Sequence, residues 1–134
     1  MQTNVKSGRI KRIAAVNLTG MEDMLIKIVS VGGEPQANLP GATTDDVQHV
    51  LINGAPAGSY ADLEPLTPDR QVRVRLEGTC EPGDDIVLSA SLGKVRKIPA
   101  APGTYRVFAK AEESGVDGQN VLLRPHFKGL VVVE

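Results

Sequence analysis

Glycine and proline interrupt this sequence so often that long helices are excluded. The 134 residues include 14 Gly and 9 Pro. Hardly any stretch longer than about ten residues keeps a helical hydrophobic period without meeting one of them, and the exceptions are Ile- and Val-rich segments that match strands better. Turn signals separate the apolar runs about every 8 to 15 residues. The pattern predicts an all-β fold, a small barrel or jelly-roll-like sandwich of about eight short strands with an extended N-terminal arm.

The apolar runs between these turns are the expected strands. In the run 24–31 both alternating faces are apolar, which predicts a strand that is covered on both sides. In the run 72–76, apolar residues alternate with two arginines and are expected to point inward. Residues 34–46 are expected to form a long loop, and Asn53 with Gly54 either a two-residue turn or part of an irregular loop. The expected strands are residues 10–18, 24–31, 47–52, 72–76, 86–90, 95–98, 105–111, 120–124 and 130–133.

The chain length fits one domain with terminal extensions. We divide it into a basic N-terminal arm at 1–13, a single β-barrel or sandwich domain at 14–128, and an apolar C-terminal tail at 129–134. No apolar run approaches the ~18–20 residues that span a bilayer, and residues 1–12 lack the apolar region of a signal peptide. We therefore expect a protein that is made in the cytoplasm and has no membrane partner.

Charge is separated along the chain although the net charge is only −1. Four cations precede the first acid, Glu22, and no Lys or Arg lies between Lys27 and Arg70. The separation either lets one face meet an oppositely charged neighbour or leaves solvated charges on the surface. The N-terminal cations are Lys6, Arg9, Lys11 and Arg12; the acids of the middle are Glu34, Asp45, Asp46, Asp62, Glu64 and Asp69; further cations follow at Arg70, Arg73, Arg75, Lys94, Arg96 and Lys97.

The residues that usually carry chemistry are scarce. His49 and His126 are the two histidines and neither lies in a catalytic motif, so we expect no catalytic residue. Acidic neighbours are expected to raise the pKa of Cys80, the one cysteine, which disfavours a reactive thiolate. Asp45, Asp46 and His49 have suitable chemistry for a metal but match no metal-binding loop, so neither a metal nor another cofactor is expected.

Nucleic acid is an unfavoured partner for the same compositional reason. The basic N-terminus and the Arg70–Arg75 region carry positive charge, but small barrels that hold single strands add aromatic side chains on which bases stack. The chain has two Tyr, two Phe and no Trp, and at least two of the four are expected in the core.

Over residues 14–126 the chain resembles the capsid cement, or head decoration, proteins of tailed bacteriophages. The resemblance is carried by residues 90–98, 103–115 and 119–126, where a Gly-containing hairpin precedes an Ala-rich strand, a spacer, and a Val/Leu strand ending near Arg and Pro. Residues 72–78, 81–84 and 86–90 match the upstream order of strand, Gly, Gly-Asp turn and strand. The resemblance implies a non-enzymatic, all-β virion protein that binds the outer surface of the assembled capsid, commonly as trimers.

This resemblance sets the expected partners and contact residues. The partners are the major capsid protein and further copies of the chain, as a homotrimer. Lys6, Arg9, Lys11 and Arg12 are expected to order against an acidic capsid surface or a neighbouring subunit. Leu130, Val131, Val132 and Val133 need to be covered, either by an adjacent subunit or by the chain's own barrel.

Two other function classes remain open from the sequence. A tail, baseplate or adhesin β-module would share the turn-rich, disulfide-free composition. A trimeric β-fold enzyme would need acids such as Asp45, Asp46 and Asp84 to converge in one pocket.

Overall fold

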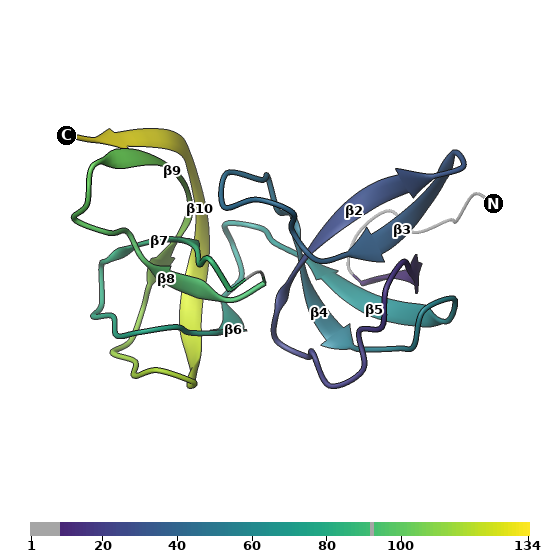
Figure 1. Ribbon diagram of the computed structural model, residues 1–134. Helices are drawn as coiled ribbons and strands as arrows, with labels where there is room; N and C mark the ends of the chain where they lie inside the picture. The colour runs from purple at the N-terminus through teal and green to yellow at the C-terminus, as the bar shows by residue number, and fades with distance from the viewer. Residues whose placement is uncertain (1–8, 92) are drawn as a thin grey trace.

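The computed structural model describes residues 9–91 and 93–134 and shows two β lobes side by side (Figure 1). The first lobe is a closed five-stranded barrel with the strand order β1-β3-β2-β4-β5. Its strands are β1 (Ile10–Ala14), β2 (Leu25–Val31), β3 (Glu34–Asn38), β4 (His49–Asn53) and β5 (Tyr60–Pro65).

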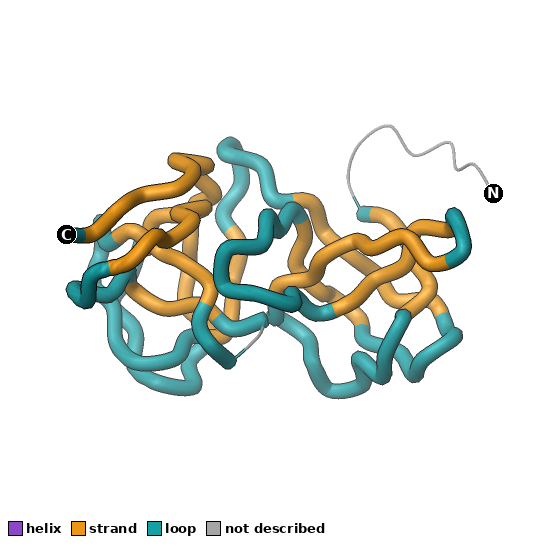
Figure 2. The backbone as a smooth tube through the Cα atoms, turned by 45° about the horizontal axis from the view of Figure 1, so that its top comes forward, coloured by secondary structure: helices purple, strands orange, loops and turns teal. Residues whose placement is uncertain are grey.

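The second lobe is a five-stranded sheet with the order β6-β10-β9-β7-β8. All of its neighbouring strands are antiparallel, and loops without helix connect the strands in both lobes over the described residues (Figure 2). The predicted all-β fold with a small barrel is therefore confirmed, with ten strands in two sheets. The strands are β6 (Val72–Arg75), β7 (Asp85–Leu88), β8 (Val95–Lys97), β9 (Gly103–Ala111) and β10 (Asn120–Val133).

A hairpin between β2 and β3 corrects the long loop expected at 34–46. Gly32 and Gly33 both have positive φ, 60° and 84°, which is the conformation of a two-residue hairpin turn that matches strand twist. Residues 34–38 then pair antiparallel with β2, while β1 runs parallel to β3. The prediction of a loop was wrong for residues 34–38, because a proline such as Pro35 is excluded only from a strand that pairs on both sides. The register partner of Pro35 is Ser30, and the β1 ladder begins one residue later at Gln36, so β3 is an edge where Pro35 lies.

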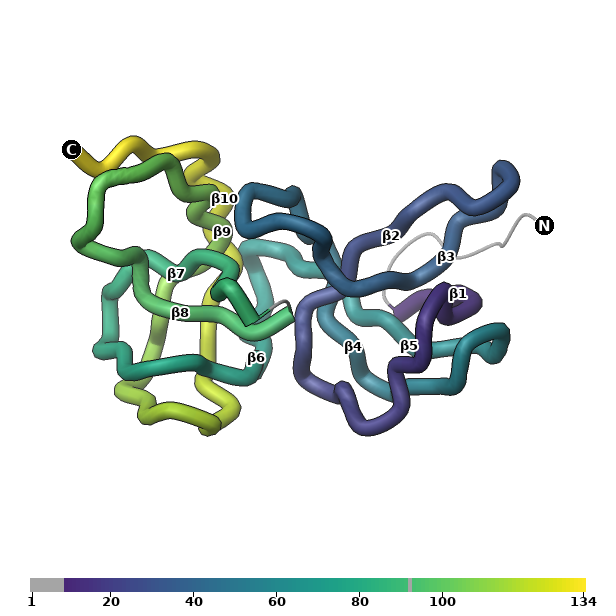
Figure 3. The backbone as a smooth tube through the Cα atoms, in the orientation of Figure 1, coloured from purple at the N-terminus to yellow at the C-terminus, as the bar shows by residue number. Residues whose placement is uncertain are grey.

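β1 closes the barrel between β3 and β5 (Figure 3). The barrel consequently begins at Ile10, inside the interval 1–13 that the sequence assigned to the arm. Residues 1–8 of that interval lie outside the described residues.

β2 and β4 carry apolar side chains into two different cores. Leu25 and Val50, which are register partners, belong to the core between the barrel and the second sheet. Their neighbours Ile26 and Leu51 point the other way, into the barrel interior. All four are buried, so the prediction of a strand covered on both faces is confirmed for the first part of β2.

The second sheet matches the expected strands closely. Val74 and Leu76 are fully buried as the alternation predicted, and β7 and β8 form the expected antiparallel hairpin. The C-terminal region differs. Residues 120–124 and 130–133 belong to one strand of 14 residues, interrupted by a bulge between Pro125 and Gly129.

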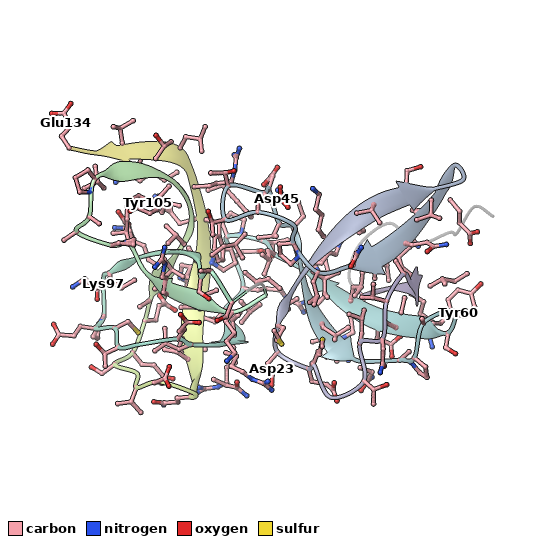
Figure 4. All side chains as sticks on the ribbon, in the orientation of Figure 1. Asp23, Asp45, Tyr60, Lys97, Tyr105 and Glu134 are labelled. Atoms are coloured by element: carbon pink, nitrogen blue, oxygen red, sulfur yellow. The ribbon has the colours of Figure 1, made fainter. Side chains whose placement is uncertain are left out.

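Asp23 connects the two lobes through hydrogen bonds in three directions. Its N–H donates to the carbonyl of Leu51 in the barrel, and its own carbonyl accepts from the N–H of Arg75, both at 2.9 Å. Its carboxylate accepts from the side-chain amide of Asn120 in β10, also at 2.9 Å. Asp23 lies between the lobes (Figure 4) and has a positive φ of 66°, a conformation that Asp tolerates better than most residues.

The Asn53-Gly54 dipeptide opens an irregular loop, one of the two alternatives that the sequence allowed, since β5 begins only at Tyr60. A Cβ atom at Gly54 would overlap the backbone carbonyl of Leu18 and lie 2.9 Å from Oε2 of Glu22. Glycine is therefore required here by close backbone approach.

We predict that Gly54→Ala lowers the free energy of unfolding by about 1–3 kcal/mol, because the backbone around Leu18 has to move. Gly41→Ala is the matched control, since its Cβ would meet Asp45 at an ordinary 3.7 Å. Urea unfolding of the three proteins measures the effect. Equal midpoints for the two variants would contradict the close-approach explanation.

Candidate interaction surfaces

The basic residues of the N-terminal strand are paired with acids of the same chain. β1 runs antiparallel to β5, which places Lys11 opposite Asp62. Nζ of Lys11 lies 3.5 Å from Asp62, and Nε of Arg9 lies 2.9 Å from Glu64, which also binds Arg70 at 2.8 Å. The charge separation seen in the sequence is thus partly neutralised within the fold, because the basic strand lies beside the acidic one.

These ion pairs leave the cations accessible. The side chains of Arg9 and Lys11 remain 62% and 73% exposed, and pairs of this kind contribute about 0–1 kcal/mol each to stability. Arg12 lies on the opposite face of β1, across from buried Ala61, and its Nη1 donates to the carbonyl of Lys11. Lys6, the fourth expected contact residue, lies outside the described residues.

Tyr60 extends this cationic surface. Tyr60 is the register partner of Ile13, and Ile13 follows Lys11 by two residues and so lies on the same face of β1. The side chain of Tyr60 is 59% exposed and lies at the outer end of the barrel lobe (Figure 4). We call the outer side chains of these two strands, together with Arg9 just before β1, the β1–β5 face. The strand members are Lys11, Ile13, Tyr60, Asp62 and Glu64, and Arg9 is joined to Glu64 by an ion pair. The sequence did not single out Tyr60, because strand alternation alone does not tell which aromatic side chains remain outside the core.

The C-terminal strand carries three of the exposed large apolar side chains. Leu130 and Val132 are 56% and 66% exposed, and Phe127 is 42% exposed. Residues 130–133 pair along one edge with β9 of the same chain, so the chain itself covers one edge of the expected contact segment. The end of β10 lies at the opposite extremity of the molecule from Tyr60 (Figure 4).

Charge pairs also bridge the strands of the second sheet. Asp85 forms ion pairs with two lysines: its Oδ1 lies 3.6 Å from Nζ of Lys110, and its Oδ2 lies 3.3 Å from Nζ of Lys128. Arg124 holds the pKa of Glu112 below its usual value, and the backbone N–H of Leu122 is the main cause of the lowered pKa of Glu113. Further pairs are Arg73–Glu113, Lys97–Asp84 and Arg124–Glu112.

The acids that an enzyme would need have separate partners. Asp45 accepts N–H groups of Gly41 and Ala42 in its own loop, and Asp46 accepts from Gln48. Asp84 accepts the N–H of Glu81 in the turn before β7. Within residues 9–91 and 93–134, no group of three or more His, Cys, Asp and Glu side chains is placed to hold a metal ion.

The two histidines and the cysteine lie in strands, bulges or bridges, apart from one another along the fold. His49 is half-buried at the start of β4, and burial lowers its pKa, with Arg12 adding to the effect. His126 is exposed in the bulge of β10. Cys80 is buried, and its backbone forms an isolated β-bridge with Gly115. Burial is the main cause that raises the pKa of its thiol, and Asp84 adds to it. The raised pKa expected from the sequence is therefore confirmed.

Ser89 is the buried polar residue among those described, and the sequence did not single it out. Its hydroxyl lies 3.1 Å from Oε2 of Glu77 and 3.0 Å from the carbonyl oxygen of Ser91, and it accepts the N–H of Ser91. Hydrogen bonds from Ser91 and Ser89 lower the pKa of Glu77. The cluster fixes the turn that begins after β7 against the end of β6.

An open groove of about 380 Å³ separates the lobes on one side. Its walls carry Asp23, Glu64, Asp69, Arg70 and Arg73 among apolar residues of β4 and β6. Glu64 forms an ion pair with Arg70, and Arg73 forms one with Glu113. These charged groups of the groove are therefore already paired within the chain. No helix within the described residues has the length and apolarity needed to cross a membrane.

The fold is shared with a phage head protein of known structure. The chain is similar to the head fiber gp8.5 N base of bacteriophage phi29, with a TM-score of 0.66 over 94% of this chain and 92% of that chain. The two sequences are 17% identical, so the similarity establishes a common fold.

No family model matches the chain. A stretch of 43 residues is 46% identical to a DNA gyrase subunit from Granulibacter bethesdensis, which covers 32% of this chain and 5% of the gyrase chain. The chain thus spans only a small fraction of that relative's length.

The hydrogen bonds of Asp45 predict a loss of stability in acid. The N–H of Gly41, at 2.7 Å, is the main cause that lowers the pKa of Asp45, and Lys27 at 3.3 Å adds to it. Because the folded-state pKa is below the unfolded value of about 3.9, this contribution is present above that pH and is lost as the pH falls through the folded value.

We predict that Asp45→Asn lowers the free energy of unfolding at pH 7 by about 1 kcal/mol, and that the difference from wild type shrinks as the pH falls below the unfolded-state pKa of about 3.9. Urea unfolding at several pH values measures it. Asp46→Asn, whose carboxylate meets only Gln48 among the described residues, serves as control. A difference that persists unchanged in acid would show that the charge of Asp45 is not the cause.

Proposed function

We propose that this chain is a structural protein of a bacteriophage virion that binds the outer surface of the assembled capsid and stabilises it, without enzymatic activity. The observation that carries the proposal is the fold shared with the phi29 head fiber N base over nearly the whole of both chains. The resemblance of residues 72–126 to capsid decoration proteins points to the same class independently.

The surface supports this role better than a catalytic one. Exposed apolar or cationic side chains lie at both ends of the elongated molecule, Tyr60 with Arg9 and Lys11 at one end and Leu130 with Val132 toward the other, as in proteins that work through contacts. Binding only to the assembled lattice stabilises the assembled state by linkage, and many copies reinforce a shell even when each contact is modest.

We propose the β1–β5 face as the capsid-binding surface. It combines an exposed aromatic residue, Tyr60, with the accessible cations Arg9 and Lys11. Tyr and Arg are enriched at protein interfaces, and Lys11 adds positive charge that complements an acidic partner. The major capsid protein would present acidic and apolar groups to it.

A tail or baseplate module is the second candidate, because the same fold and surface would serve it. Copy number separates the two roles. Hundreds of copies per particle fit a decoration protein, whereas a handful fit a tail component.

We predict that adding the protein to undecorated capsids raises the temperature at which they release their contents. Calorimetry and electron microscopy of capsids with and without the protein measure stabilisation and occupancy. Saturating occupancy without any change in release temperature would count against the stabilising role, and absence of binding would remove capsid binding itself.

The contact surface is tested by the double variant Lys11→Glu/Tyr60→Ser in a co-sedimentation assay. We expect its affinity for capsids to fall at least about tenfold, since it loses an aromatic anchor and reverses a charge. Val116→Ser is the control, because Val116 is 62% exposed in the loop between β9 and β10 of the other lobe. Equal binding of both variants would show that the capsid contact lies elsewhere.

The start of β1 at Ile10 decides which deletion can test the N-terminal residues. Deletion of residues 1–12 would remove most of β1 and open the barrel, so loss of binding could follow from unfolding. Deletion of residues 1–8 leaves β1 complete. We propose that this shorter deletion weakens capsid binding if Lys6 takes part, and unchanged binding would restrict the contact to Arg9, Lys11 and their neighbours.

A further inference from the structure

The end of β10 has an unpaired strand edge. β6 pairs with residues 120–123 of β10, and β9 pairs with the opposite edge as far as Val133. Within the described part of the chain, no strand pairs with β10 beyond β6 on that first edge, along residues 126–133. The backbone N–H and C=O groups of this segment therefore provide a template for another strand.

The other two edge strands of the sheet are protected in the usual ways, and the residues after β6 also bridge to β8, where Leu76 pairs with Val95. β6 and β8 are four and three residues long, and each carries two cations, Arg73 and Arg75 or Arg96 and Lys97. The free end of β10 is longer and exposes Leu130 and Val132 instead. Charged side chains, short length and bulges are the usual safeguards against pairing with another chain. The bulge and Lys128 lie before Gly129, and residues 129–133 beyond them carry no charged side chain.

The order of side chains along this edge is complementary to itself. Lys128, Leu130, Val132 and Glu134 are all exposed. An antiparallel pairing of two copies centred on Val131 places Leu130 opposite Val132 of the second copy, and Lys128 opposite Glu134, at both ends of the contact. Apolar and oppositely charged cross-strand pairs each stabilise a sheet by about 0.2–1 kcal/mol. One register therefore matches apolar and charged side chains together.

We propose that two copies of this chain associate through the free edges of β10, antiparallel and centred on Val131, to form one continuous sheet. The contact is isologous, because the same edge serves both copies, and it closes at two. It therefore predicts dimers, where the resemblance to decoration proteins implies trimers. The proposal does not depend on capsid binding, and the experiments below use no capsid.

A single cysteine at the centre of the contact tests the register. In the proposed pairing the two copies of residue 131 are direct partners, at a Cα separation of about 4.5–5.5 Å that a disulfide can span. We expect Val131→Cys to form covalent dimers under mild oxidation. Val116→Cys, at a loop position that is more exposed than Val131, and the wild type with its buried Cys80 are controls. Cross-linking of Val131→Cys no faster than Val116→Cys overturns the proposal.

A charge swap tests the pairing without covalent chemistry. Glu134 forms no ion pair with any described residue, so Glu134→Lys leaves the fold intact while it sets Lys128 against a lysine at both ends of the contact. We expect dimer dissociation to become about tenfold easier, and Glu134→Gln, which removes the charge without reversing it and leaves the Lys128–Asp85 pair untouched, to have a smaller effect. Light scattering over a concentration series measures both. A wild-type mass that stays monomeric, or that reaches three copies, overturns the proposal.

Discussion

The structure depends on two strands that bury side chains on both faces. In β2 and β4, Leu25 and Val50 pack against the second sheet, while Ile26 and Leu51 fill the barrel. Burial of a side chain of this size contributes about 1.5–3 kcal/mol, so both cores rely on the same short segments. The barrel and the sheet consequently cannot separate without exposing Leu25 and Val50, and the molecule is held as an elongated pair of lobes whose outer ends are far apart.

This arrangement decides which charges remain available to a partner. Antiparallel pairing brings the basic strand β1 beside the acidic strand β5, so cations that are isolated in the sequence meet Asp62 and Glu64 in the fold. The acids proposed for an enzyme are likewise held by their own loops and turns. Two of the surfaces that the fold leaves open to other molecules are the β1–β5 face with Tyr60 at one extremity and the free edge of β10 at the other.

The two proposed contacts use different physics, and this makes them separable. The β1–β5 face would recognise a partner through an aromatic anchor and accessible cations, a contact that salt weakens. The edge of β10 would pair through backbone hydrogen bonds, with side-chain order setting the register. The phi29 head fiber N base shares the fold that positions both, but its 17% identity does not carry individual contact residues across.

Local chemistry was enough to predict the strands of the second sheet and the all-β class. The alternation in residues 72–76 and the Gly-containing turn between β7 and β8 depend only on neighbouring residues in the sequence. The same is true of the absence of a catalytic motif around either histidine. The expectation at Pro35 was wrong because its tolerance in β3 depends on where β1 begins to pair, which sequence spacing does not reveal. Tertiary structure alone decided that cations of β1 would face acids far along the chain, that Tyr60 would stay outside the core, and that β10 would outrun β6, because each outcome depends on which strands become neighbours.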